Sequence, residues 1–184
     1  MTGTRRQPIW MAEAAAEATN GVTSGDWQAS GVSIDTRTLR EGDLFIALSG
    51  PNFDGHDYVL SALENGAAAA VVQADKAPGF RSTSPNSSLL EVADTMAALE
   101  DLGRAARQRS SARIIAVTGS VGKTGTKEAL KLAFGTQGRV SATEGNLNNH
   151  FGLPLSLARM PENTEFGIFE MGMNHPGEIA PLSS

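Results

Sequence analysis

The sequence predicts an α/β fold made of two successive domains with mostly parallel sheets. Two observations support this prediction. Short apolar runs that suit buried strands alternate with amphipathic segments of helical period along most of the 184 residues. One such run, at residues 114–117, passes directly into a turn of small residues and then into a helical pattern. That order of strand, turn and helix is typical of a parallel α/β unit.

The periodicity gives the expected order of the elements. Helices are expected at residues 8–19, 58–65, 95–109 and 152–160 and from 123 onward, and strands at 31–35, 43–48, 68–72, 89–92, 114–117, 140–143 and 166–170. Pro8 lies in the first turn of the first of these helices. The segment 75–88 is rich in Pro, Gly and Ser and indicates a domain junction. The expected domains are therefore residues 1–84 and 85–184.

Composition excludes several classes of function. The net charge of −5 and the lack of a long basic run argue against a nucleic-acid partner. There is no cysteine, so the chain has no disulfide or thiolate metal site, and three scattered histidines do not indicate zinc. The N-terminal segment lacks an apolar stretch long enough for a signal peptide or a membrane span. We expect a cytoplasmic protein that does not bind membranes.

The segment at residues 113–131, RIIAVTGSVGKTGTKEALK, predicts a phosphate-binding turn and makes the second domain P-loop-type. A helix start has unpaired backbone N–H groups and a partial positive charge, so it stabilises an anion. Gly119 and Gly122 allow the backbone to turn tightly and to approach phosphate oxygens. Lys123 is then placed for the β- and γ-phosphates, and the Thr124 hydroxyl for Mg²⁺.

The spacing of this turn departs from the standard P-loop. That motif has a glycine at the position of Val117, so the chain carries the shorter pattern G-x-x-G-K-T. The alternative is an ordinary strand-to-helix turn with a solvated lysine. A Lys-Thr pair that opens a helix directly after an apolar strand favours nucleotide phosphate. A dinucleotide fold is disfavoured because the spacing is not G-x-G-x-x-G.

A second group of polar residues is expected beside this turn. The apolar run FGIFE ends in Glu170, and the carboxyl ends of parallel strands meet at one edge of a sheet. Glu170 either holds the Mg²⁺ of a bound nucleotide or is a solvated acid at a strand end, and the residues alone leave both readings open. Likewise, the amides of Asn146, Asn148 and Asn149 serve either a ligand or turn formation.

Three motifs together resemble the Mur ligases of peptidoglycan synthesis. They are TGSVGKT at residues 118–124, GNLNNHFGLPLSL at 145–157 and EMGMNHPGEI at 170–179. The front half agrees, because SIDTRTLREGDLFIALSGPNFDGHDY at residues 33–58 is similar to the UDP-sugar-binding segment of that family. The NLNN and NHPGEI segments favour the branch of the family that joins D-Ala-D-Ala to UDP-MurNAc-tripeptide.

The resemblance implies an ATP-dependent amide ligase that works through an acyl phosphate, with ATP and Mg²⁺ as cofactors. It implies catalytic roles for Lys123 and Glu170, with Thr124 and Glu170 as the Mg²⁺ ligands. The residues implied for ATP are Thr118, Gly119, Ser120, Val121, Gly122, Lys123, Thr124 and Asn148. The residues implied for the UDP-sugar peptide are Ser33, Asp35, Thr36, Arg37, Asn52, Asp54, Gly55, His56, Asn146 and Asn149. Arg37 suits a diphosphate because a guanidinium binds two oxygens at once.

Length is the main departure from the family pattern. Family members continue through the rest of the central domain and a C-terminal domain, so we expect the 184 residues to be a fragment that does not ligate alone. We expect a full-length parent to be a monomer. The alternatives are another ligase of the superfamily, such as one that adds a single amino acid or a folylpolyglutamate synthase, a non-catalytic nucleotide or UDP-sugar binding module, and a P-loop kinase or GTPase. The shortened loop disfavours the last of these.

Overall fold

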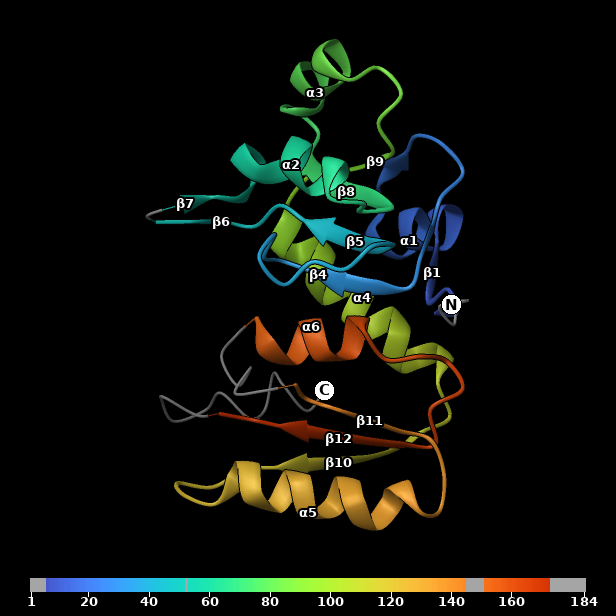
Figure 1. Ribbon diagram of the computed structural model, residues 1–184, viewed down its shortest axis with the longest axis vertical. Coiled ribbons are helices and arrows are strands. Elements are labelled where there is room, and N and C mark those ends of the chain that lie inside the picture. The colour runs from blue at the N-terminus through green and yellow to red at the C-terminus, as the bar shows by residue number, and fades with distance from the viewer. Residues whose placement is uncertain (1–5, 52, 145–150, 173–184) are drawn as a thin grey trace. The chain divides into compact units, whose positions relative to one another are not determined.

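The computed structural model describes residues 6–51, 53–144 and 151–172 (Figure 1). Contacts within the chain divide it into two compact units, Met1–Leu102 and Gly103–Ser184. Both units are α/β, as the alternating pattern predicts. Each unit is described by itself below.

The first unit is built on a sheet of five strands in the order β2-β9-β8-β5-β4. Four neighbours run parallel: β4 (Gly31–Ser33), β5 (Asp43–Ile46), β8 (Ala69–Gln73) and β9 (Leu89–Val92). The edge strand β2 (Val22–Thr23) pairs antiparallel with β9. Apolar runs without alternation, such as residues 44–46 and 69–72, suit parallel strands because these are covered on both faces.

Helices supply the apolar layers that bury this sheet. Val59 and Ala62 of α2 (Val59–Glu64) and Ala77 of α3 (Ala77–Thr83) pack with one face of the sheet, at Phe45, Ala70, Val72 and Leu89. The alternate residues Leu44, Ile46, Val71 and Leu90 are equally buried. Helix α1 (Ala12–Thr19) lies against β9. This core holds β4, β5 and β8 in place. The polar loops begin at the carboxyl ends of these strands.

Two short antiparallel pairs complete this unit. Strand β1 (Trp10–Met11) pairs with β3 (Gln28–Ala29), and β6 (Ser49–Gly50) pairs with β7 (Phe53–Asp54). A 3₁₀ helix, η1 (Gly55–Tyr58), leads from β7 into α2. Gly55 is required there by space, because a Cβ atom would lie 2.6 Å from the carbonyl oxygen of Leu48. The β6–β7 pair and η1 together form a loop that is rich in polar residues.

The second unit has three parallel strands in the order β10-β12-β11. They are β10 (Arg113–Val117), β11 (Val140–Ala142) and β12 (Phe166–Glu170). Helix α5 (Lys123–Gly135) covers one face of this sheet and α6 (Gly152–Ala158) covers the other (Figure 1). On the α6 side, Leu153 and Met160 pack with Phe169. On the α5 side, the rings of Phe134 and Phe166 stack with their centroids 4.6 Å apart.

The division between the units differs from the expected junction at residues 84/85. Strand β9 pairs with β8 and β2 in the first sheet, and the Pro- and Gly-rich segment before it contains α3. The contacts therefore divide the chain inside helix α4 (Thr95–Arg109). The first helix also begins later than expected, at Ala12, because Trp10 and Met11 pair with β3.

Two glycines at the start of α5 allow a direct test of this local structure. Gly122 has a φ of 79°, whereas Gly125 lies inside α5, and a Cβ atom at either position would meet nothing within 4 Å. Gly122→Ala should destabilise α5 by about 1–2 kcal/mol through its left-handed backbone. Gly125→Ala should stabilise it by about 0.5–1 kcal/mol.

Hydrogen exchange of the α5 amides measures both effects, because local opening is read separately for each segment. The two substitutions add the same methyl group three residues apart, so each is the control for the other. Equal effects of the two would contradict the backbone geometry described for this turn.

Candidate functional site

The glycine turn of the second unit is an exposed strand-to-helix connection. Residues 118–122 are exposed, and β10 ends at Val117 just before them. Gly119 has a φ of 142° and Gly122 a φ of 79°. A residue with a side chain would be strained in either conformation. Gly122 is the N-cap of α5, and among the described residues no side chain caps that helix start. The first N–H groups of the helix are thus placed to bind an anion from outside.

The side chain of Lys123 lies over this turn. Its Nζ donates a hydrogen bond of 2.6 Å to the carbonyl oxygen of Gly119. The ammonium group therefore lies beside the turn, close to the partial positive charge of the helix start. A polyphosphate at this place would meet backbone donors and one cation.

Glu170 and Thr124 meet at the same edge of the sheet. Strands β10 and β12 are parallel neighbours with Val117 opposite Glu170, so both end at one level. The Thr124 hydroxyl donates a hydrogen bond of 3.1 Å to Oε2 of Glu170. The backbone N–H of Glu170 donates to Oγ1 of Thr143 at 3.0 Å. The structure thus brings together two residues that the sequence places 46 positions apart.

These two oxygen groups fit a small hard cation. Mg²⁺ prefers oxygen ligands at about 2.1 Å in octahedral geometry, so adjacent ligand oxygens lie about 3 Å apart. The separation of 3.1 Å between Thr124 Oγ1 and Glu170 Oε2 agrees with this spacing. Among the described residues, no three His, Asp or Glu side chains gather to hold a metal by themselves. The donor set therefore suits a cation that takes its other ligands from phosphate and water.

In the first unit, the turn after β4 carries an ion pair. The guanidinium of Arg37 binds Asp35 in a bidentate arrangement, with Nε to Oδ1 at 3.0 Å and Nη2 to Oδ2 at 2.6 Å. These bonds hold the pKa of Asp35 below its ordinary value. The side chain of Arg37 is 87% exposed and that of Thr36 is half-buried, whereas Ser33 is buried and its hydroxyl donates to the carbonyl of Asp35. Ser33 thus shapes the turn, and Arg37 faces solvent.

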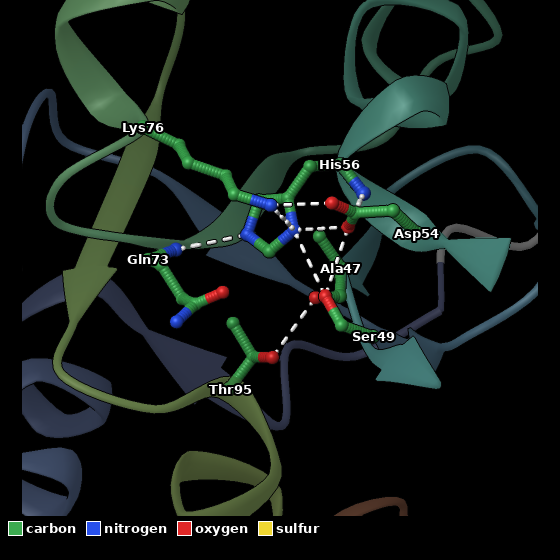
Figure 2. A network of polar contacts seen from close by, with 7 residues as sticks. All are labelled: Ala47, Ser49, Asp54, His56, Gln73, Lys76 and Thr95. Carbon is green, nitrogen blue, oxygen red and sulfur yellow. Dashed lines mark hydrogen bonds and ion pairs between the residues drawn. The ribbon is translucent and has the colours of Figure 1, made fainter. Parts of the chain in front are cut away.

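A polar network joins the β6–β7 pair to β8 (Figure 2). Asp54 accepts hydrogen bonds from Ser49 at 2.9 Å and from the backbone N–H of His56 at 3.0 Å, and it forms an ion pair with Lys76. Lys76 is the main cause that holds the pKa of Asp54 well below its ordinary value. Figure 2 also shows the hydroxyl of Thr95, which donates to the carbonyl of Ala47 at 2.9 Å.

The ring of His56 is buried inside this network with both nitrogens engaged. Nε2 accepts the backbone N–H of Gln73 at 3.0 Å, so Nδ1 carries the proton and donates to Asp54 at 2.6 Å. His56 is 5% exposed and stacks on Phe80. The sequence predicts His56 and Gly55 as substrate contacts, and the structure places both inside the loop. There they set the shape of the surface that Asp54 and Ser49 share.

Family models match most of the chain. The model described as "Mur ligase family, catalytic domain" matches residues 28–107, and "Mur ligase middle domain" matches residues 117–184. The chain belongs to the Mur ligase family. Among the described residues of this Mur ligase chain, no helix is both long and apolar enough to cross a membrane.

Named relatives agree with the family assignment. The UDP-N-acetylmuramoyl-tripeptide--D-alanyl-D-alanine ligase of Bacillus subtilis is 48% identical over 153 residues, which are 83% of this chain and 33% of the relative. The enzyme of the same name from Rickettsia prowazekii is 40% identical over 95% of this chain and 37% of its own length. The Mur ligase chain described here thus spans about a third of these relatives.

Solved structures show the same fold. One structure of MurF from Acinetobacter baumannii has a TM-score of 0.79 at 35% identity, over 96% of this chain and 38% of that one. The MurF ligase of Thermotoga maritima in complex with ADP has a TM-score of 0.58 at 34% identity, over 83% of this chain and 34% of that one. The parallel sheets of the Mur ligase fold are therefore shared with these proteins.

Four of the residues predicted to bind nucleotide or substrate lie outside the described residues: Asn52, Asn146, Asn148 and Asn149. Sequence reasoning missed three polar residues of the two sites: Lys76, Lys127 and Thr143. A signal existed for Lys127, which interrupts the stripe of Leu130 and Phe134 that faces the sheet. None existed for Lys76 or Thr143, whose partners are distant in sequence.

The Asp54 network predicts a pH-dependent contribution to stability. A carboxylate whose folded pKa is lowered stabilises the fold above its unfolded pKa, and this stabilisation is lost as the pH falls through the folded pKa. Asp54→Asn should lower the free energy of unfolding at pH 7 by about 1–2 kcal/mol, a figure reduced for the partial exposure of Asp54. The difference from the unsubstituted chain should shrink as the pH falls below about 4.

Urea unfolding followed by tryptophan fluorescence measures this effect, because both tryptophans, Trp10 and Trp27, lie in the first unit. Asp57→Asn is the matched control, since Asp57 is exposed and three residues away. A loss of stability that stayed constant down to pH 2 would show that the charge of Asp54 is not its cause.

Proposed function

We propose that this chain serves ATP-dependent amide ligation, in which D-alanyl-D-alanine is joined to UDP-N-acetylmuramoyl-tripeptide. The relatives that carry this activity in their names support the reaction. The observation that carries the proposal in this structure is the contact of Thr124 with Glu170 beside the glycine turn. The proposal places the enzyme in the cytoplasm as a monomer.

The second unit binds ATP in this proposal. The backbone N–H groups at the start of α5 and the ammonium of Lys123 bind the β- and γ-phosphates. Thr124 and Glu170 hold Mg²⁺, which neutralises charge on the phosphate oxygens when it is bound. The terminal carboxylate of the tripeptide attacks the γ-phosphorus, so the bond to the β-phosphate oxygen breaks and ADP leaves. The amine of D-alanyl-D-alanine then attacks the acyl carbon, the bond from that carbon to the phosphate oxygen breaks, phosphate leaves, and the proton of the amine passes to water.

The first unit binds the UDP-sugar part of the substrate. Arg37 is the group for the diphosphate, because its exposed guanidinium can leave the Asp35 carboxylate for a doubly charged partner. The β6–β7 pair, held by Asp54 and His56, borders the same substrate. The chemistry itself thus depends on positioning and charge neutralisation by both units.

Two substitutions should show that ADP and UDP bind at different sites. Lys123→Ala should abolish binding of ADP by the 184-residue chain and leave UDP binding intact, because it removes the cation over the glycine turn. Arg37→Ala should do the reverse. Calorimetric titration with each nucleotide, and with one in the presence of the other, measures both. Competition between ADP and UDP for one site would contradict the assignment.

Ligation itself is tested in a chimera. Residues 1–184 replace the matching third of the Bacillus subtilis ligase, and tight ADP binding shows that the chimera folds. Phosphate release should need ATP, the UDP-tripeptide and D-alanyl-D-alanine together, and Lys123→Ala in the chimera should stop it. Release driven by a single amino acid on a shorter UDP-peptide would instead identify a ligase of an earlier step.

A further inference from the structure

A buried lysine lies in helix α5 beside the proposed metal site. Lys127 is 1% exposed, although most lysines lie at the surface. Its Nζ donates a hydrogen bond of 2.9 Å to the carbonyl oxygen of Thr143 and lies 3.2 Å from Oε1 of Glu128. Burial of an ammonium group is costly unless it is paired. Its position therefore calls for a role that an apolar residue would not fill.

Thr143 connects this lysine to the strand that carries Glu170. Thr143 follows β11 directly and is 2% exposed. Its carbonyl accepts from Lys127, while its hydroxyl oxygen accepts the backbone N–H of Glu170 at 3.0 Å. Its own N–H donates to the carbonyl of Ile168 at 3.1 Å. One residue thus fixes the end of β12 through two bonds and receives the lysine through a third.

The contacts that start at Lys127 lead back to the same helix, α5, at Thr124. The carboxylate of Glu170 accepts from the hydroxyl of Thr124 at 3.1 Å, and Thr124 lies three residues before Lys127. Residues three apart lie on the same face of a helix. Thr124, Glu170, Thr143 and Lys127 therefore form a closed set of contacts between α5, β12 and the end of β11. A shift of any member moves the carboxylate relative to the hydroxyl.

We infer that Lys127 is a positioning residue that holds Glu170 in the orientation needed for a metal–nucleotide complex, and that it acts through Thr143. The inference rests on the proposed function of this site. Its physical basis is that partners of metal ligands orient those ligands, and their loss typically weakens metal binding about 10- to 100-fold. Lys127 and Thr143 touch neither nucleotide nor metal in this role.

Substitutions at Thr143 give the sharpest test, because they keep the buried ammonium paired. Thr143→Val removes the oxygen that accepts from Glu170 and retains the carbonyl that accepts from Lys127. Thr143→Ser restores that oxygen. Thr136→Val is the matched control, since the hydroxyl of Thr136 bonds to the carbonyl of Ala133 just beyond the other end of α5. Lys127→Met removes the ammonium and tests the first contact of the set.

Two measurements on the 184-residue chain report the effect. The first is the Mg²⁺ concentration that half-maximally raises ADP affinity, compared with ADP affinity in EDTA. The second, made without metal or nucleotide, is hydrogen exchange of the Glu170 amide. Thr143→Val should raise the Mg²⁺ requirement roughly tenfold or more, speed exchange at Glu170 and leave ADP affinity in EDTA unchanged. Thr143→Ser and Thr136→Val should behave as the unsubstituted chain does.

Lys127→Met should repeat the signature of Thr143→Val, and the two together should add little, as expected for residues that act in one set. An unchanged Mg²⁺ requirement in Thr143→Val would overturn the inference. A Lys127→Met variant that loses ADP affinity equally in EDTA would also overturn it, because the lysine would then act on phosphate directly. If Mg²⁺ has no effect on ADP binding by the unsubstituted chain, the metal assignment of the proposed function fails instead.

Discussion

The register between β10 and β12 is the constraint on which the second unit depends. Side chains along a strand alternate between the two faces, so a slip of one residue would move each side chain to the other face. Phe169 packs with Leu153 on the α6 side, and the buried neighbours Ile168 and Glu170 therefore face α5. The apolar core thus fixes which face carries the carboxylate. Val117 lies opposite Glu170, so the glycine turn begins at the same edge of the sheet at which the Glu170 carboxylate lies.

Asp54 in the first unit and Glu170 in the second are both held in a defined orientation, but by different means. Asp54 is fixed by a cation, Lys76, with a neutral histidine and a hydroxyl as further donors. Glu170 receives the hydroxyl of Thr124 and is held at its backbone by Thr143. A carboxylate already neutralised by a lysine is a poor metal ligand, because the cation would have to displace that lysine. Asp54 therefore suits a structural role, and Glu170 remains suited to a metal.

The sequence was informative where function depends on a local pattern. Gly119, Gly122, Lys123 and Thr124 are adjacent in the chain, and the expected strand and helix around them are confirmed. The burial of His56 depends instead on the N–H of Gln73, 17 residues away, and no local pattern in the sequence indicates it. Two-residue strands such as β6 and β7 have no periodicity to detect. The local pattern also does not show which residues of α5 are buried, since Ala129 and Ala133 are exposed and Lys127 is buried.

The different exposures of the polar residues in the first unit bear on which of them bind ligand. An exposed ion pair contributes only about 0–1 kcal/mol, so the Arg37–Asp35 contact opens at little cost when a diphosphate offers a stronger partner. The His56 ring turns outward only at a higher cost, because the N–H of Gln73 would lose its acceptor and Asp54 would lose one of its donors. The exposed Arg37–Asp35 pair is therefore free to rearrange toward a ligand, whereas the buried network around His56 keeps the β6–β7 loop in one shape.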